Sequence, residues 1–315
     1  MTPGHATLGG PLGEANELAS CVRSVAVEAL PLHPGRFTGS VSSIDLGGAM
    51  LEILRSDPVL LLGAAARGRG GFLLVLDAAG EARWNGAAIG MGQVALFGDG
   101  QPVAIASRGP LACALVSSTG PEAAGVLPPG WRRSWHDPPD PVRRVGGKAH
   151  ARLAALAQGA VRATAGVPGR AEAVRARHAS LRDAVEGLFA PREGTVPRRR
   201  GRPPSRLQIV READDYLRAN PARPVYTDEL CATLGVSASC LHGAFGGIFG
   251  LSPHRYLKLR RMAMARAMLL SGSGPWHSVK AAALSHGFWH LGQFAHDYRA
   301  TYGEAPSETL ARAGE

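Results

Sequence analysis

The spacing of apolar residues changes along the chain, from short runs in the first part to helical intervals in the second. Between residues 36 and 120, Gly, Pro or Asp separates most of the apolar runs. The runs are Phe37–Leu46, Met50–Leu54, Val59–Leu62, Phe72–Leu76, Gln93–Phe97, Val103–Ala106 and Leu111–Val116. Asn85-Gly86 favours a tight hairpin. The pattern predicts a β-rich domain over residues 1–147, either a barrel or a sandwich.

Helical spacing begins after this domain. His150–Ala163 and Ala171–Leu188 carry Leu and Val at helical intervals, and a Gly- and Pro-containing break over residues 166–169 separates them. We therefore expect a helical hairpin over residues 148–190. The sequence leaves open whether this hairpin only covers the β-rich domain or also joins two copies of the chain.

Residues 191–206 are rich in Arg and Pro and predict an exposed linker. Helical spacing returns over residues 207–312, with a first helix marked by Leu207–Leu217 and a second that Thr227 opens. A turn at Leu234–Ser237 leads into a third helix. Ser252-Pro253 predicts the cap of a long fourth helix, which ends at Ser271-Gly272. Its expected buried stripe is Tyr256, Leu257, Met262, Ala265 and Leu269.

The helix-turn-helix pattern then occurs a second time. Val279–Leu284 predicts a short helix, and His286-Gly287-Phe288 predicts the turn. The last helix of this unit is expected to place Leu291, Phe294, Ala295 and Tyr298 on its apolar side. Together the patterns predict an α+β chain in which an all-α domain with two helix-turn-helix units, joined by a long helix, follows the β-rich domain and its hairpin.

A helix that enters the major groove needs small or polar side chains toward the bases and apolar side chains toward its own domain. In the second unit the candidates for DNA contact are Trp289, His290, Gly292, Gln293, His296 and Arg299. Gln293 and His296 are expected at the bases, and Arg299 at phosphate. In the first unit they are Ser237, Ser239, His242 and Gly243. The long helix of about twenty residues would span about 30 Å, close to the ~34 Å between successive major-groove faces.

Residues Leu207 to Leu310 resemble the AraC/XylS family of bacterial transcription regulators. The resemblance rests on Ala282, Gly287-Phe288, Phe294, Tyr298, Tyr302-Gly303 and Pro306-Ser307. Within it, the stretch from Gly287 to Phe294 and that from Pro306 to Leu310 look most like the ethanolamine-operon regulator branch. The resemblance implies a dimer or ligand-controlled activator that recruits RNA polymerase and senses a small amine or other metabolite. The first recognition helix departs from the family pattern, because it is rich in Gly and has no Arg or Lys.

The charge of the chain favours a polyanionic partner. The formal net charge is +10, and roughly +7 of it lies after Pro191. Arg198, Arg199, Arg200 and Arg202 form a short basic arm. Such an arm suits either the narrow minor groove of A·T-rich DNA or nonspecific phosphate contact.

Other classes of function find little support in the sequence. The four cysteines, Cys21, Cys113, Cys231 and Cys240, form no C-x-x-C pair, so we expect neither disulfides nor zinc, no other metal and no cofactor. No export signal or membrane span is visible, which favours the cytoplasm. Nucleophile and phosphate-loop motifs of enzymes are missing, and Cys113 is expected to be buried and inert. Trp84, Trp131 and Trp135 could line an effector pocket or form core.

The sequence thus predicts a cytoplasmic, effector-responsive regulator of transcription that binds double-stranded DNA at two adjacent major-groove turns, with RNA polymerase as a partner. A homodimer is expected, and the effector is not identified. One alternative is a ligand-independent architectural protein that coats or bends DNA with little sequence preference. The other is an enzyme fused to a DNA-binding domain.

Overall fold

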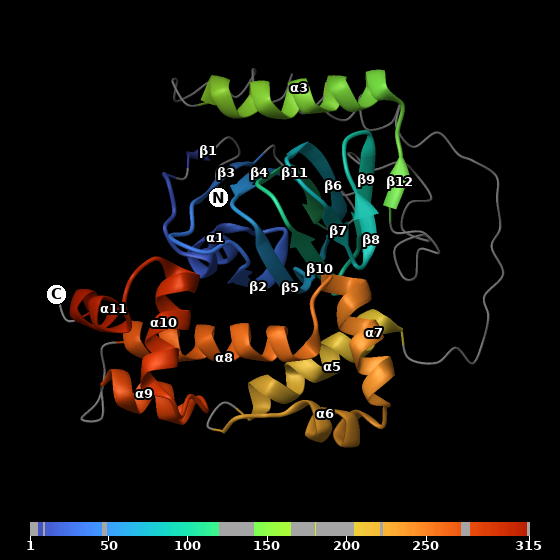
Figure 1. Cartoon of the computed structure of the whole chain (residues 1–315). Coiled ribbons are helices and arrows are strands. Elements are labelled where there is room, and N and C mark those ends of the chain that lie inside the picture. The colour runs from blue at the N-terminus through green and yellow to red at the C-terminus, as the bar shows by residue number, and fades with distance from the viewer. Residues whose placement is uncertain are drawn as a thin grey trace. The chain divides into compact units, whose positions relative to one another are not determined.

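The computed structural model describes residues 6–8, 10–45, 49–119, 142–164, 180, 205–220, 223–271 and 278–313 (Figure 1). The chain forms two compact units, one of Met1–Ala29 with Thr38–Gly201 and one of Leu30–Phe37 with Arg202–Glu315. The arginine arm, Trp131, Trp135 and nearly all of the second hairpin segment lie outside the described residues. The domain boundaries expected at residues 147, 190 and 206 stay predictions.

The first unit is built from two β-sheets. A seven-stranded sheet has the order β1-β3-β4-β11-β6-β9-β12, and a five-stranded sheet has the order β2-β5-β10-β7-β8. The strands are β1 Ala6–Leu8, β2 Val25–Pro31, β3 Gly39–Asp45, β4 Ala49–Ser56, β5 Val59–Ala65, β6 Arg69–Ala78, β7 Ala82–Trp84, β8 Ala87–Ile89, β9 Gln93–Phe97, β10 Pro102–Ser107, β11 Leu111–Thr119 and β12 Val142–Arg144. The predicted β-rich domain is therefore confirmed, and of the two expected architectures it has that of a sandwich.

Each of the seven apolar runs forms a strand, as predicted. The hairpin at Asn85-Gly86 is confirmed as well, because it joins β7 to β8 and both residues have positive φ, +50° and +87°. Helix α1 (Ala15–Cys21) and strands β1, β2 and β12 were not predicted from the sequence. Strand β2 ends at Pro31, and its burial does not alternate cleanly, so its pattern gives only a weak strand signal.

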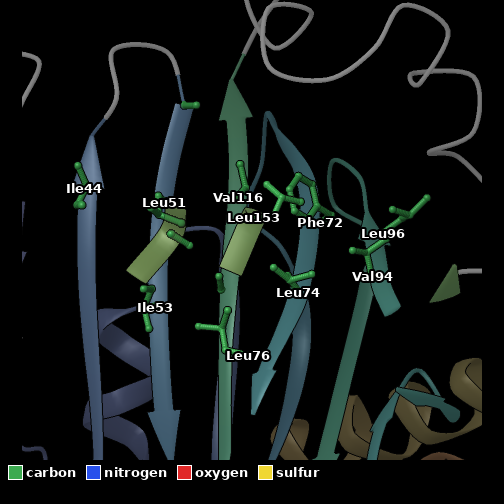
Figure 2. Close-up of a cluster of buried hydrophobic side chains, with 13 residues drawn as sticks. Ile44, Leu51, Ile53, Phe72, Leu74, Leu76, Val94, Leu96, Val116 and Leu153 are labelled. Carbon is green, nitrogen blue, oxygen red and sulfur yellow. The ribbon is translucent and has the colours of Figure 1, made fainter. Parts of the chain in front are cut away.

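One face of the seven-stranded sheet is covered by helix α3 (Gly147–Thr164), the first helix of the predicted hairpin. Leu153 and Ala157 of α3 pack on side chains from β3, β4, β6, β9 and β11 (Figure 2). A fully buried Leu contributes about 1.5–3 kcal/mol, so this face holds α3 firmly. His150 adds a polar anchor, with its Nε2 2.8 Å from the Val75 carbonyl oxygen. This helix thus covers the sheet, and a role in dimerisation stays a prediction.

Buried polar and aromatic groups of this unit belong to its core. Glu52 is fully buried, and its carboxylate accepts hydrogen bonds from the backbone amides of Arg23 (2.6 Å) and Ser24 (2.8 Å). Burial, together with the charge of Glu52, raises the pKa of the Cys113 thiol to about 12, so this cysteine is an inert core thiol. Trp84 is also fully buried and lies against Phe97, which makes it a core residue.

Seven helices are described in the second compact unit. They are α5 Arg206–Ala219, α6 Thr227–Leu234, α7 Ala238–Phe249, α8 Pro253–Leu270, α9 Val279–Ser285, α10 Leu291–Tyr302 and α11 Pro306–Ala313. In the described part of the chain, no single helix is long and apolar enough to span a membrane; α6 and α7 reach that length and apolarity only as a pair bent by 100°.

Candidate DNA-binding interface

Helices α6 and α7 form the first helix-turn-helix unit. Helix α6 ends at Gly235, and Ser237 caps α7 by accepting a hydrogen bond from the Cys240 amide (3.2 Å). The start of α6 differs slightly from the prediction, because Tyr226 occupies the capping position and Thr227 is the first helical residue. Asp228 and Glu229 lie in the first turn, where the helix dipole favours their charge.

The two sides of α7 have opposite characters. Its buried side consists of Leu241, Ala244, Phe245, Ile248 and Phe249. Each residue assigned to DNA contact in this unit is exposed, namely Ser237, Ser239, His242 and Gly243. Cys240 is exposed beside them. The structure therefore brings the four candidates together on the solvent side of one helix, where they could enter the major groove of DNA.

The fold itself does not require glycine at position 243. A Cβ added to Gly243 would meet nothing within 4 Å, whereas one added to Gly247 would lie 2.8 Å from Nη1 of Arg206. We expect Gly243→Ala to raise the free energy of unfolding by about 0.5–1 kcal/mol, since Ala loses less entropy in a helix. If the α7 backbone approaches DNA at this point, the same variant should bind DNA more weakly.

Urea unfolding and a DNA titration of the same preparation would check both effects. Gly246→Ala is the matched control, because position 246 is also open. DNA affinity that is unchanged in Gly243→Ala would remove Gly243 from the interface.

Helices α9 and α10 form the second helix-turn-helix unit. The turn between them lies at His286, Gly287 and Phe288, as predicted, and Gly287 has a φ of +77°. The amide of Phe288 donates to the Ala283 carbonyl (2.9 Å), and His286 Nδ1 lies 2.8 Å from the Ala282 carbonyl oxygen. These bonds satisfy the end of α9 and fix where α10 begins.

The solvent side of α10 carries the remaining candidates. Phe294, Tyr298 and Tyr302 are buried, while the residues expected at DNA are all exposed: Trp289, His290, Gly292, Gln293, His296 and Arg299. Trp289 and His290 precede the helix, which starts at Leu291. The cap residue His290 makes no side-chain capping bond, so its ring is available for another partner.

Leu291 corrects the sequence analysis, which placed it on the apolar side of this helix. Its exposed fraction is 38%, and that of the neighbouring Trp289 is 65%. The core at this point is occupied by Phe288 and Phe294, whose ring centroids lie 5.0 Å apart. Because apolar side chains can contact thymine methyl groups in the major groove, Leu291 joins the candidate interface. Its residue type alone suggested core, and only the structure shows its exposure.

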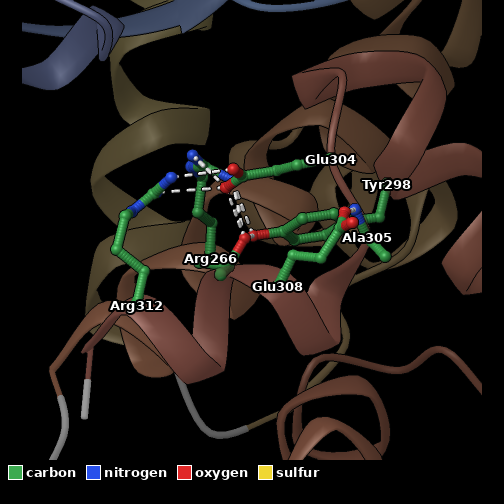
Figure 3. Close-up of polar contacts among 7 residues, drawn as sticks. Arg266, Tyr298, Glu304, Ala305, Glu308 and Arg312 are labelled. Carbon is green, nitrogen blue, oxygen red and sulfur yellow. Dashed lines mark hydrogen bonds and ion pairs between the residues drawn. The ribbon is translucent and has the colours of Figure 1, made fainter. Parts of the chain in front are cut away.

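A buried ionic network holds α10 against α8 and α11 (Figure 3). Arg266 of α8 donates to the Tyr298 hydroxyl (2.8 Å) and pairs with Oε1 of Glu304 (2.9 Å). Thr309 of α11 donates to the same carboxylate (2.6 Å), and Arg312 pairs with its other oxygen (2.7 Å). Burial would raise the pKa of Glu304, but the hydrogen bonds from Thr309 and Arg312 and the charge of Arg266 outweigh it and lower that pKa. Glu304 is therefore a charged anchor for the second helix-turn-helix unit.

Helix α8 joins the two helix-turn-helix units, and side chains near its start bond to helices on both sides. It has 18 residues, which corresponds to about 27 Å, near the predicted length. Its predicted buried stripe is confirmed, with Tyr256, Leu257, Met262, Ala265 and Leu269 all buried. At the first unit, the Tyr256 hydroxyl donates to Asp214 of α5 (2.6 Å). At the second, Lys258 pairs with Asp297 of α10 (2.7 Å).

A second connection between the two helix-turn-helix units was not visible in the sequence. A Cβ built on Gly287 would lie 2.6 Å from Cβ of Pro224, so the second turn packs directly on the segment before α6. The guanidinium carbon of Arg261 lies 5.4 Å from the Phe288 ring centroid and 6.0 Å from that of Tyr226. We call these five residues the inter-unit contact. Together with α8 it holds the two recognition helices in one body.

The start of α6 carries a charge cluster that titrates in acid. Hydrogen bonds from Arg223 and Tyr216 lower the pKa of Glu229 from 4.5 to about 2. A carboxyl group whose pKa is lower in the folded protein stabilises the fold at pH values above its pKa in the unfolded chain. This contribution disappears as the pH falls from about 4.5 toward 2. Glu229→Gln should therefore be less stable than the parent at pH 6 and equal to it near pH 2. Urea midpoints measured across this range would test it, and a gap independent of pH would contradict the assignment.

Comparison with known proteins matches the C-terminal helices to a family of helix-turn-helix domains. Residues 230–312 match a family model described as a helix-turn-helix domain. The probable thc operon regulatory protein of Rhodococcus erythropolis is 39% identical over 102 residues, which cover 32% of this chain and 31% of that protein. XylDLEGF operon transcriptional activator 2 of Pseudomonas putida is 33% identical over 96 residues, 30% of this chain and 61% of that protein. The chain thus spans about a third to three fifths of these relatives.

A solved structure matches about a third of the chain. The probable AraC family transcriptional regulator from Rhodopseudomonas palustris is 43% identical, and the match covers 34% of this chain and 98% of that one with a TM-score of 0.32. The relatives in these comparisons are named as regulators of transcription and not as enzymes. Residues 230–312 therefore form a helix-turn-helix domain, and this part of the chain is similar in sequence to known regulators of transcription.

Proposed function

We propose that this protein is a sequence-specific DNA-binding regulator of transcription. The observation that carries the proposal is the pair of recognition helices, each with an exposed polar side, held in one body by α8 and the inter-unit contact. Such a body suits two successive major-groove windows on one side of the duplex. An architectural protein needs no such pair of ordered, polar helix faces.

The two helices have different tasks in this proposal. On α10, Gln293 and His296 hydrogen-bond to base edges, while Trp289 and Leu291 offer apolar surface to thymine methyl groups. Arg299 contacts phosphate and adds affinity without sequence information. On α7, which has no Arg or Lys, the exposed Ser237, Ser239 and His242 discriminate less between sequences.

Footprinting on the promoter beside the gene tests the proposal. We expect one discrete protected site that covers two neighbouring turns of the duplex, whereas protection spread evenly over unrelated DNA would indicate an architectural protein. Repeating the footprint with candidate metabolites shows whether occupancy or transcription output depends on a small molecule.

Cys240 provides an independent test of the first window. It is exposed on α7 within the candidate interface, and Cys21 of the first unit is exposed as an internal control. In a variant with Cys231→Ser, maleimide labelling of Cys240 should slow when operator DNA is bound, while labelling of Cys21 stays constant. Equal labelling of Cys240 with and without DNA would show that α7 does not enter the groove.

The names of the relatives also bear on the finer role of the protein. The relatives named as operon activators favour an activator of a nearby metabolic operon that recruits RNA polymerase. The resemblance of the stretch from Gly287 to Phe294 to the ethanolamine-operon branch suggests an amine or another small metabolite as effector. We further propose a cytoplasmic homodimer that uses the predicted hairpin, and an arginine arm, Arg198 to Arg202, that contacts the minor groove or phosphates.

A further inference from the structure

A cavity of about 630 Å³ lies at one end of the seven-stranded sheet, where β4 and β6 end and β3 and β11 begin. These four strands are neighbours in the sheet (Figure 1). All residues that line the cavity belong to the first unit. The volume falls in the range of about 300–1,000 Å³ that is usual for sites of small molecules.

The floor of the cavity is a row of residues that face one another across the strands. Ser40 is opposite Arg55, and Ala112 is opposite both Arg55 and Asp77. Directly opposite residues project on the same side of a sheet, so these four side chains share one face. Arg55 and Asp77 are two strands apart, a backbone separation of about 9.5 Å, with the small Ala112 between them. The cavity therefore has a cation on one side and an anion on the other.

An irregularity in the sheet places the anion there. The register of β11 on β6 shifts between Ala112 and Cys113, where Cys113 is opposite Val75 and Ala112 is opposite Asp77. Without the shift, the apolar Leu76 would stand opposite Ala112. Bulges of this kind re-aim side chains and are frequent beside binding sites.

The other polar residues beside the cavity do not compete for this pair. Ser56 follows Arg55 directly in β4, so its side chain projects to the opposite face of the sheet. The neighbouring Asp57 already accepts a bond from the Thr38 amide (2.8 Å).

We propose that this cavity binds a short zwitterion, an amino acid whose carboxylate pairs with Arg55 and whose ammonium group pairs with Asp77. Charge-assisted hydrogen bonds at both ends select molecules that carry both groups. The inference deepens the effector response proposed above, because it names a site and a chemical class for the effector.

Calorimetric titration of the full chain without DNA tests the site. The probes are glycine, 3-aminopropanoate and 4-aminobutyrate, with n-butylamine and butyrate as ligands that carry only one of the charges. We expect saturable binding of at least one amino acid, about tenfold or more tighter than either single-charge ligand. Asp77→Asn should weaken binding of the amino acid about tenfold and leave binding of butyrate unchanged. Arg55→Gln should weaken binding of both the amino acid and butyrate. Glu17→Gln, at an exposed position, is the control. Failure of all three amino acids to saturate below about 10 mM would overturn the proposal.

Ligand binding is measured without DNA, so the two proposals can fail separately. Absence of a discrete footprint would overturn the proposed regulator function but not the ligand site, and absence of amino acid binding would overturn the ligand site but not the regulator function.

Discussion

Glu304→Ala should unfold or strongly destabilise the second helix-turn-helix unit. Arg266 and Glu304 are both buried, and removal of the carboxylate leaves the guanidinium without its anion. Breaking a buried ion pair from one side costs about 3–5 kcal/mol, a large part of the stability of an ordinary domain. Thr309 and Arg312 lose the same acceptor, so the contacts of α11 weaken as well. Urea unfolding monitored by far-UV circular dichroism would measure the loss.

Glu308→Ala is the control for this prediction, because Glu308 lies in the same helix region but is exposed and accepts only from the Ala305 amide (2.5 Å) in the network of Figure 3. We expect it to cost about 1 kcal/mol, the usual cost of a lost cap. If the two variants were equally stable, the carboxylate of Glu304 would not be the anchor that its contacts indicate.

The double variant Gln293→Ala with His296→Ala should lose most of its specificity for the operator. Each lost base contact is worth about 1–3 kcal/mol, so the pair together should reduce specific binding by about 2–6 kcal/mol if the contacts are independent. Both side chains are exposed, and the core of α10 does not depend on them. Binding to unrelated DNA should change little, since phosphate contacts supply that affinity. Titrations of operator and unrelated duplexes at a common salt concentration provide the comparison.

Arg299→Ala is the companion variant. It should weaken both duplexes about equally and reduce the slope of affinity against salt by about one. An equal loss on both duplexes for the double variant would instead mean that Gln293 and His296 contact phosphate.

Most of the fold could be predicted from local patterns in the sequence. Apolar runs between Gly, Pro or Asp located the main strands, because turn residues and burial are both visible locally. The Ser caps located α7 and α8, and Asn85-Gly86 located its hairpin, because each needs only neighbouring residues. Helix α1 and strand β2 were missed since their positions depend on distant partners, such as the bonds from Arg23 and Ser24 to Glu52.

The candidate interface was predictable only in part, for a similar reason. Residue type and helical spacing suggested the polar side of α10, and the structure exposes every residue chosen there. Leu291 was misplaced, because its type is apolar while its first-turn position leaves it outside the core formed by Phe288 and Phe294. The contact of Pro224 with Gly287 joins residues far apart in sequence, and no local pattern indicates it.

The inter-unit contact has a consequence for the operator itself. A body whose two halves are locked together cannot stretch, and the helix that joins them is about 27 Å long, against the ~34 Å repeat of straight B-DNA. If the recognition helices are spaced by the length of α8, we expect the duplex to make up the difference by curving toward the protein. Operators with easily deformed TA or CA/TG steps between the two windows should be favoured, even at base pairs that no side chain touches.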